Sequence, residues 1–225
     1  MTNIKTKQLD LLLNDFELLA KTTLTQWQIT HKLLQDNTIE SLYEEAEANE
    51  VIIDRLEIKV REEVVFTIFQ FNPKAADLRK IITYQDITTN LERVGDMLLN
   101  IIHFVRVTDF SHPEFAEINK TIYKMLEKVG TMLRNAVFSF ANEDSNMAYQ
   151  VIKEDDKVDE LCHQISLYLQ EKFEGRKISK VDIRNMIQSN AIAHNLERIG
   201  DSATNIAESA IYLTEGKDIR HGNQG

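Results

Sequence analysis

Twelve residues near the middle of the chain are almost repeated near its end. The segment NLERVGDMLLNI begins at Asn90, and NLERIGDSATNI begins at Asn195. Each copy places a glutamate and an aspartate four residues apart, with a glycine directly before the aspartate. Residues four apart in a helix lie on the same face, separated by about 40°. Such a pair can present carboxylate oxygens to one cation, and oxygen ligands suit hard cations such as Mg, Mn, Ca and Fe.

Acidic pairs with the same spacing occur upstream of both segments. At an offset of 105 residues, EVIID from Glu50 aligns with DDKVD from Asp155. An isolated pair is usually a solvated helix face, because like charges at this spacing cost roughly a few tenths of a kcal/mol in water. Four pairs in register instead predict two carboxylate clusters that need cations between helices to stay ionised. The candidate metal ligands are Glu50, Asp54, Glu92, Asp96, Asp155, Asp159, Glu197 and Asp201.

Two glycines and two asparagines accompany these acids. Gly95 and Gly200 each precede the last aspartate of a pair, although glycine inside a helix costs roughly 1 kcal/mol relative to alanine. The missing side chain predicts close helix packing beside the acids, and the alternative is that glycine simply relieves a helix crossing. Asn100 and Asn205 extend each acidic stripe by one turn. We treat them as additional candidate ligands or as groups supporting the ligands.

The elements that must position these side chains are predicted to be helices. Apolar residues recur with a helical period, and the 225 residues include only 7 Gly and 2 Pro. An all-α fold follows. Six long helices are expected at about residues 4–35, 38–71, 73–107, 113–141, 143–174 and 180–214.

Short polar segments separate these helices and predict how they begin and end. Asparagine or serine followed three residues later by an acid is typical of a capping box, and glycine often follows a helix. The predicted boxes are Asn37 with Glu40, Ser111 with Glu114 and Ser179 with Asp182; Asn72 is expected to cap a helix starting at Pro73, and Gly175 and Gly216 to end helices.

The chain contains two copies of one three-helix unit. Eight of the twelve residues in the repeated window are identical, and DLRKI from Asp77 aligns with DIRNM from Asp182 at the same offset. Short loops make each unit an up-down-up bundle. We expect one repeat at residues 1–107, a second at 113–215, and a disordered polar tail at 216–225.

Composition narrows the classes of function. The formal net charge of −10 disfavours a nucleic-acid surface, which needs clustered Lys and Arg. The single Cys162 cannot form an intrachain disulfide. No signal peptide or membrane span is expected from the sequence, so we expect a cytoplasmic protein. Nucleotide-binding loops and recognised hydrolase motifs are also missing.

A metal-dependent enzyme or a metal-storage bundle is the main alternative. Carboxylate-bridged di-iron bundles use two ExxH motifs on facing helices, and Glu160 with His163 forms one such motif. The positions 105 residues earlier are Arg55 and Ile58, so the motif has no second copy. Cys162 is interpreted as a packed side chain. Five phenylalanines are interpreted as core or as a docking face, and we prefer the core; they are Phe66, Phe69, Phe71, Phe138 and Phe140.

The repeated ER[IV]GD motif with a downstream NI, together with the upstream DLR and DDKVDEL segments, resembles the PhoU family of phosphate-uptake regulators. The resemblance covers nearly the whole chain in length, repetition and motif order. Many members carry a histidine after the last motif aspartate, where this chain has Met97 and Ser202. The second repeat also has KISKVDIR instead of a proline-containing helix start.

The resemblance implies a fold, a cofactor and partners. It implies two three-helix bundles whose eight acids hold clusters of iron, zinc, magnesium or manganese ions. It implies a non-enzymatic, cytoplasmic negative regulator that forms a homodimer. The implied partners are the ATPase of the phosphate ABC transporter and a phosphate-sensing histidine kinase. Distant relatives accompany other anion transporters, so an accessory role for such a transporter is a further alternative.

Overall fold

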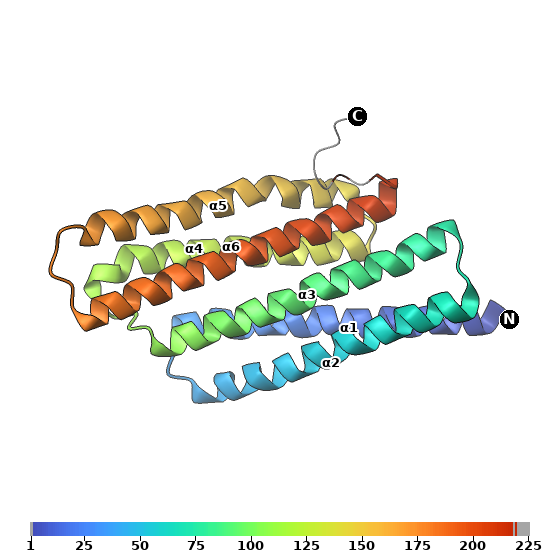
Figure 1. Cartoon of the computed structure of the whole chain (residues 1–225), viewed down its shortest axis with the longest axis horizontal. Helices are drawn as coiled ribbons and strands as arrows, with labels where there is room; N and C mark the ends of the chain where they lie inside the picture. Colours follow the sequence, from blue (N-terminus) through green and yellow to red (C-terminus); the bar gives the residue numbers. More distant parts are fainter. Residues whose placement is uncertain (1, 218, 220–225) are drawn as a thin grey trace.

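The computed structural model describes residues 2–217 and 219, with side chains from residue 11 onward. Across these residues the chain forms six α-helices and one short 3-10 helix (Figure 1). They are α1 (Thr2–Gln35), α2 (Glu40–Phe71), α3 (Ala75–Val107), η1 (Pro113–Phe115), α4 (Ala116–Ala141), α5 (Ser145–Phe173) and α6 (Lys180–Glu215).

The helices form two three-helix bundles, one from α1 to α3 and one from α4 to α6. Within each bundle, consecutive helices run in opposite directions (Figure 1). Helices α3 and α6 also pack against each other in opposite directions, and they form the main seam between the bundles (Figure 1). The predicted all-α fold of two three-helix bundles is confirmed, and residues 2–217 contain no strand.

Several helix ends differ from the sequence-based expectation. Asn72 does not begin α3; it adopts a left-handed conformation with φ 44° and ends α2 by donating its backbone N–H to Ile68. Helix α3 starts two residues after Pro73, and Lys74 precedes it without a side-chain cap. Asn37 does not cap α2, which follows Ile39. Tertiary packing stabilises these helices, so they can begin without a side-chain cap.

Of the four remaining predicted positions, one is wrong and two are correct, while Gly175, with φ 68°, follows Glu174, the C-cap residue of α5. Ser111 is not a cap, because its N–H and hydroxyl both donate to Asp109, and His112 precedes η1 instead. Ser179 and Asp182 form the predicted capping box at α6. Gly216 ends α6 at φ 71°. Of the predicted polar tail only residues 216, 217 and 219 are described, so its expected disorder lies outside the described residues.

Two asparagine side chains, the buried Asn185 and the half-buried Asn37, hold the junction between the bundles. The Asn185 amide on α6 accepts the Asp109 N–H at 3.1 Å and donates to the Asp109 carbonyl at 3.0 Å. The Asn37 amide donates to the carbonyls of Val105 and Thr108. These bonds satisfy backbone groups that the end of α3 leaves without helical partners. The turn after α3 is therefore fixed to both bundles.

The core assignment of the five phenylalanines is only partly correct. Phe140 is buried and meets the rings of Phe16 and Tyr84 edge-on across the two bundles. Phe66, Phe69 and Phe138 are exposed. Periodicity identifies an apolar face but does not tell whether another element covers it.

A second, smaller seam joins α1 to α4. It includes Gly130, where a Cβ would overlap the indole ring of Trp27. The Arg134 guanidinium covers the same indole at 4.8 Å. No side chain fits at position 130 unless Trp27 moves.

The described helices also contain no apolar stretch of the length and hydropathy that a bilayer crossing requires.

The contact of Gly130 with Trp27 predicts that alanine destabilises the protein at this position, whereas helix propensity alone predicts the opposite. Gly130→Ala should gain about 1 kcal/mol of helix propensity but lose more through overpacking, which costs about 1–3 kcal/mol. We expect a lower melting temperature and a shift in the emission of Trp27, the single tryptophan of the chain. Lys120→Ala, at an exposed position of the same helix, should change neither. A more stable protein with unchanged emission would contradict the assigned contact.

Candidate functional site

Helices α2 and α3 bring the first four candidate acids to one side of the first bundle. Glu50 and Asp54 lie one turn apart on α2, and Glu92 and Asp96 lie one turn apart on α3. Glu50 is 8% exposed, and neither of its carboxylate oxygens has a hydrogen-bond partner. Glu92 is half-buried, whereas Asp54 and Asp96 are exposed. One carboxyl group therefore lies beneath three more accessible ones.

The pKa values show that these four acids interact. Burial and then the nearby carboxylates of Asp96, Asp54 and Glu92 together raise the pKa of Glu50 to about 8. Burial also raises the pKa of Glu92, followed by repulsion from Asp96. The carboxyl groups of Glu50 and Asp96 are therefore neighbours across the contact between α2 and α3. A cation bound between them would remove the same repulsion.

Helices α5 and α6 repeat this arrangement in the second bundle. Burial, then repulsion from Asp201 and Asp159, raises the pKa of Asp155 to about 6. Burial likewise raises the pKa values of Glu197 and Asp201, and in both cases Asp159 adds repulsion. One carboxylate oxygen of Asp155 is buried without a hydrogen-bond partner. Asp155 thus occupies the place that Glu50 holds in the first bundle.

Glu50 and Asp155 each place a buried carboxylate oxygen against a glycine of the neighbouring helix. A Cβ on Gly95 would be 3.2 Å from Glu50 Oε2 and 2.9 Å from Ile53 Cδ1. A Cβ on Gly200 would be 3.4 Å from Asp155 Oδ1 and 3.3 Å from a Val158 methyl carbon. The glycines therefore let α2 approach α3, and α5 approach α6, at the level of the acids.

The donor set suits a hard cation, but its side chains are not arranged as a finished metal site. Among the described residues, no three His, Cys, Asp or Glu side chains are grouped so that they could hold a metal ion. The unpartnered oxygens of Glu50 and Asp155 are nevertheless the groups that such an ion would satisfy.

The two acidic sets differ in their surroundings. In the first bundle Glu57 is buried one turn from Asp54 and forms an ion pair with Arg61. The equivalent position in the second bundle is Cys162, whose Sγ lies 3.7 Å from His194 Nδ1.

Cys162 and His194 line a pocket of about 220 Å³ together with Asp159, His163, Ser166 and Glu197. Burial raises the Cys162 pKa to about 11, so its thiol stays protonated at neutral pH. The sequence interpretation of Cys162 as a packed side chain agrees with this placement, but it missed the neighbouring imidazole.

Residues of the α3–α6 seam lie beside the acids. Arg93 of the first bundle is close enough to lower the pKa of Asp201 in the second, a relation that sequence spacing alone did not indicate. Asn205 lines a separate pocket of about 200 Å³ with Asp86, Thr89, Asn90 and Ser209. Asn100 is exposed on α3. The repeated asparagines therefore differ in environment, and Asn205 faces the seam.

Comparisons with known proteins agree with the repeated architecture. A model of the PhoU domain matches residues 16–105 and again residues 122–210. A relative from Aquifex aeolicus, described as a phosphate-specific transport system accessory protein PhoU homolog, is 35% identical over 80% of this chain and 79% of its own length. One with the same description from Clostridium acetobutylicum is 32% identical over 75% of each chain.

The fold of this chain also matches that of solved structures. The crystal structure of PhoU from Pseudomonas aeruginosa superposes with a TM-score of 0.83 at 24% identity, over 94% of this chain and 99% of that one. The two matches to the PhoU domain coincide with the two bundles, and each contains one pair of acidic motifs. By its sequence and its fold, this chain belongs to the PhoU family.

Proposed function

We propose that this protein is a non-enzymatic, metal-binding regulator of phosphate uptake that acts in the cytoplasm. The observation that carries the metal-binding part is the twice-repeated burial of an unpartnered carboxylate oxygen against a glycine. The regulatory part is supported by the relatives, which are described as accessory proteins of the phosphate-specific transport system. We infer that the chain negatively regulates transport and phosphate-starvation signalling through the transporter ATPase and a sensor histidine kinase.

In this proposal the acids hold their helices together through cations. Glu50 and Asp54 of α2 would share ions with Glu92 and Asp96 of α3, and Asp155, Asp159, Glu197 and Asp201 would do the same for α5 and α6. A bound cation supplies the positive charge that lets buried carboxylates ionise. Both helix pairs would then present stable outer surfaces to a protein partner. Asn100 and Asn205 would support the ligands.

The two sites are expected to differ in metal preference. The first offers carboxylates only, including the neighbouring Glu57, which favours magnesium or manganese. The second adds the imidazole of His194 and the thiol of Cys162, which favours zinc or iron. The regulator would then carry a different ion in each bundle.

Removal of one acid from each bundle tests the proposed ligands. We expect Glu92→Ala and Glu197→Ala each to lose about half of the bound metal, and the double variant to lose nearly all of it, because metal binding requires several ligands. Elemental analysis of the purified proteins measures this. Glu117→Ala, at an exposed position on α4, is the matched control. Full metal content in the double variant would refute the assignment.

The raised pKa of Glu50 predicts how stability depends on pH in chelator-treated protein. Its ordinary value is 4.5 and its folded value is about 8, so between these values the folded state holds a proton that the unfolded state releases. Stability should therefore fall as the pH rises from 4.5 to about 8. Thermal melts should show a shallower fall for Glu50→Gln, which cannot ionise. Equal slopes for both proteins would show that Glu50 is not desolvated.

The regulatory role is tested in cells. Deletion of the gene should raise expression of phosphate-starvation genes or change phosphate uptake in phosphate-rich medium, because the negative regulator is lost. Complementation by Glu117→Ala but not by the Glu92→Ala, Glu197→Ala double variant would tie that role to the acids. A reporter and an uptake assay that both stay unchanged on deletion would count against the proposal.

A further inference from the structure

Each of the two repeated twelve-residue segments contains an arginine to which the acidic sets give no role. Arg93 of α3 and Arg198 of α6 each follow a proposed glutamate ligand directly and precede an aspartate ligand by three residues. Both side chains are exposed, and neither forms an ion pair or a hydrogen bond with another residue that the structure describes. Arginine is charged at every physiological pH. Each guanidinium can therefore move when the charge around it changes.

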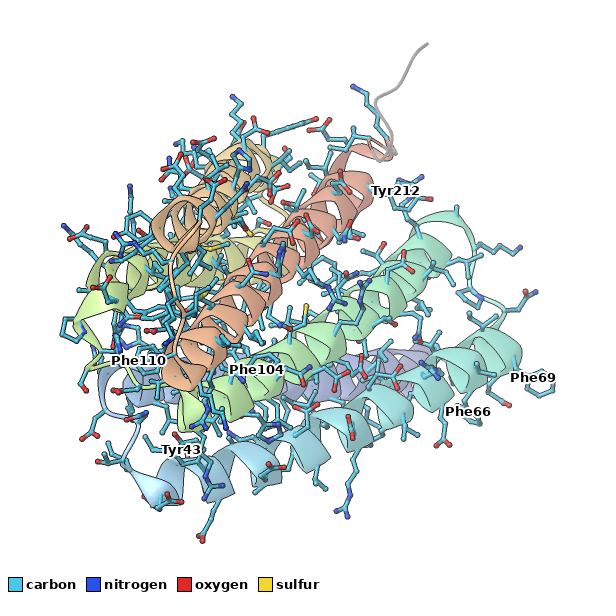
Figure 2. The ribbon with its side chains drawn as sticks, turned by 60° about the vertical axis from the view of Figure 1, so that its left-hand side comes forward. Tyr43, Phe66, Phe69, Phe104, Phe110 and Tyr212 are labelled. Atoms are coloured by element: carbon cyan, nitrogen blue, oxygen red, sulfur yellow. The ribbon has the colours of Figure 1, made fainter. Side chains whose placement is uncertain are left out.

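The packing of α3 against α6 brings these two arginines to the same level. The helices run antiparallel and side by side (Figure 1). Tyr212 lies between the end of α6 and the start of α3 (Figure 2), and the Arg79 guanidinium is 5.5 Å from the centre of its ring. Arg93 follows Arg79 by fourteen residues, and Arg198 precedes Tyr212 by fourteen. Because fourteen residues make about four helical turns, both arginines return to the faces that meet in the seam.

Contacts elsewhere along the seam agree with this register. Asp86 and Asn205 lie seven residues beyond Arg79 and Tyr212, and they line the same pocket. At the other end of the seam, Asn185 binds the backbone of Asp109 just beyond α3. The register is therefore the same from one end of the seam to the other.

This register places four charges at the middle of the seam. An aspartate ligand lies about one turn beyond each arginine, so Asp201 lies opposite Arg93 and Asp96 lies opposite Arg198. Burial raises the pKa of Asp201, and the positive charge of Arg93 opposes that rise from the other bundle. Each aspartate thus belongs to the acidic set of its own bundle and lies beside an arginine of the other.

We propose that Arg93 and Arg198 couple the two metal sites, so that a cation in one bundle weakens cation binding in the other. The coupling rests on the proposed function, because both acidic sets must bind cations. Arg93 lies between Asp201 and Glu92, and it also opposes the rise in the pKa of Glu92 that burial causes. A positive charge at Asp201 repels the guanidinium toward Glu92. There the guanidinium neutralises part of the charge that attracts a second cation.

The repetition of the segment gives Arg198 the corresponding part. Arg198 opposes the rise that burial causes in the pKa of Glu197, a ligand of its own bundle, and it lies opposite Asp96 of the other bundle. A positive charge at Asp96 therefore repels Arg198 toward Glu197. Coupling between two binding sites is equal in both directions by thermodynamic linkage. The two bundles then fill in separate steps as the metal concentration rises.

Titration with manganese(II), followed by calorimetry, tests the coupling. Asp54→Ala and Asp159→Ala each disable one site from a helix outside the seam, and each gives the affinity of the remaining site alone. In wild-type protein the second site to fill should bind about fivefold more weakly than it does alone, or weaker still. In an Arg93→Gln, Arg198→Gln background the same comparison should give a ratio close to one, because neutral side chains do not respond to the bound charge.

Arg55→Gln is the matched control. It removes the same charge beside Asp54, but it lies exposed on α2, outside the seam. It should therefore change the affinity of the first site and leave the coupling intact. Circular dichroism checks that every variant keeps its helical content.

The possible failures can be told apart. Two sites that fill independently in wild-type protein would overturn the coupling and leave the proposed function standing. Coupling that survives the loss of both arginines would do the same. Protein in which neither bundle binds manganese would overturn the coupling and the metal-binding function together.

Discussion

A carboxylate oxygen buried against a glycine, without a hydrogen-bond partner, is the costly contact that both helix pairs share. Glu50 meets Gly95 in this way, and Asp155 meets Gly200. The glycine brings the helices close together, and closeness removes the water that would stabilise the charge. Packing and ionisation are therefore linked. A proton on each of these acids, or the cation that we propose, would remove this cost.

The fold and the placement of the acids along it were predictable because both depend on local spacing. Apolar periodicity fixes which residues are helical, and the repeat in register assigns equivalent acids to equivalent helices. The boundaries of all six helices were expected within a few residues. Ser179 with Asp182 was recognisable as a capping box because its partners are three residues apart. Interactions between residues that are close in the chain can be recognised from the sequence alone.

Features that depend on distant residues were not predictable. Asn37 has the sequence context of a helix cap, yet its side-chain amide donates hydrogen bonds to the carbonyls of Val105 and Thr108. Gly130 is an ordinary glycine until Trp27 of another bundle is placed against it. Phe66 and Phe69 of α2 have the side chains of core residues, and only the packing of α1 and α3 against the other face of α2 reveals that they are exposed. In each case the deciding contact lies elsewhere in the chain.

Asn185 shows that the internal symmetry of the molecule ends at the junction. Its amide clamps the backbone of Asp109, whereas the equivalent residue of the first half, Lys80, reaches solvent and pairs with Glu143. The duplicated halves therefore retain their shared acids but no longer have interchangeable ends. Two tandem copies of the first half would lack the clamp, and the order of the halves is now a fixed property of the chain.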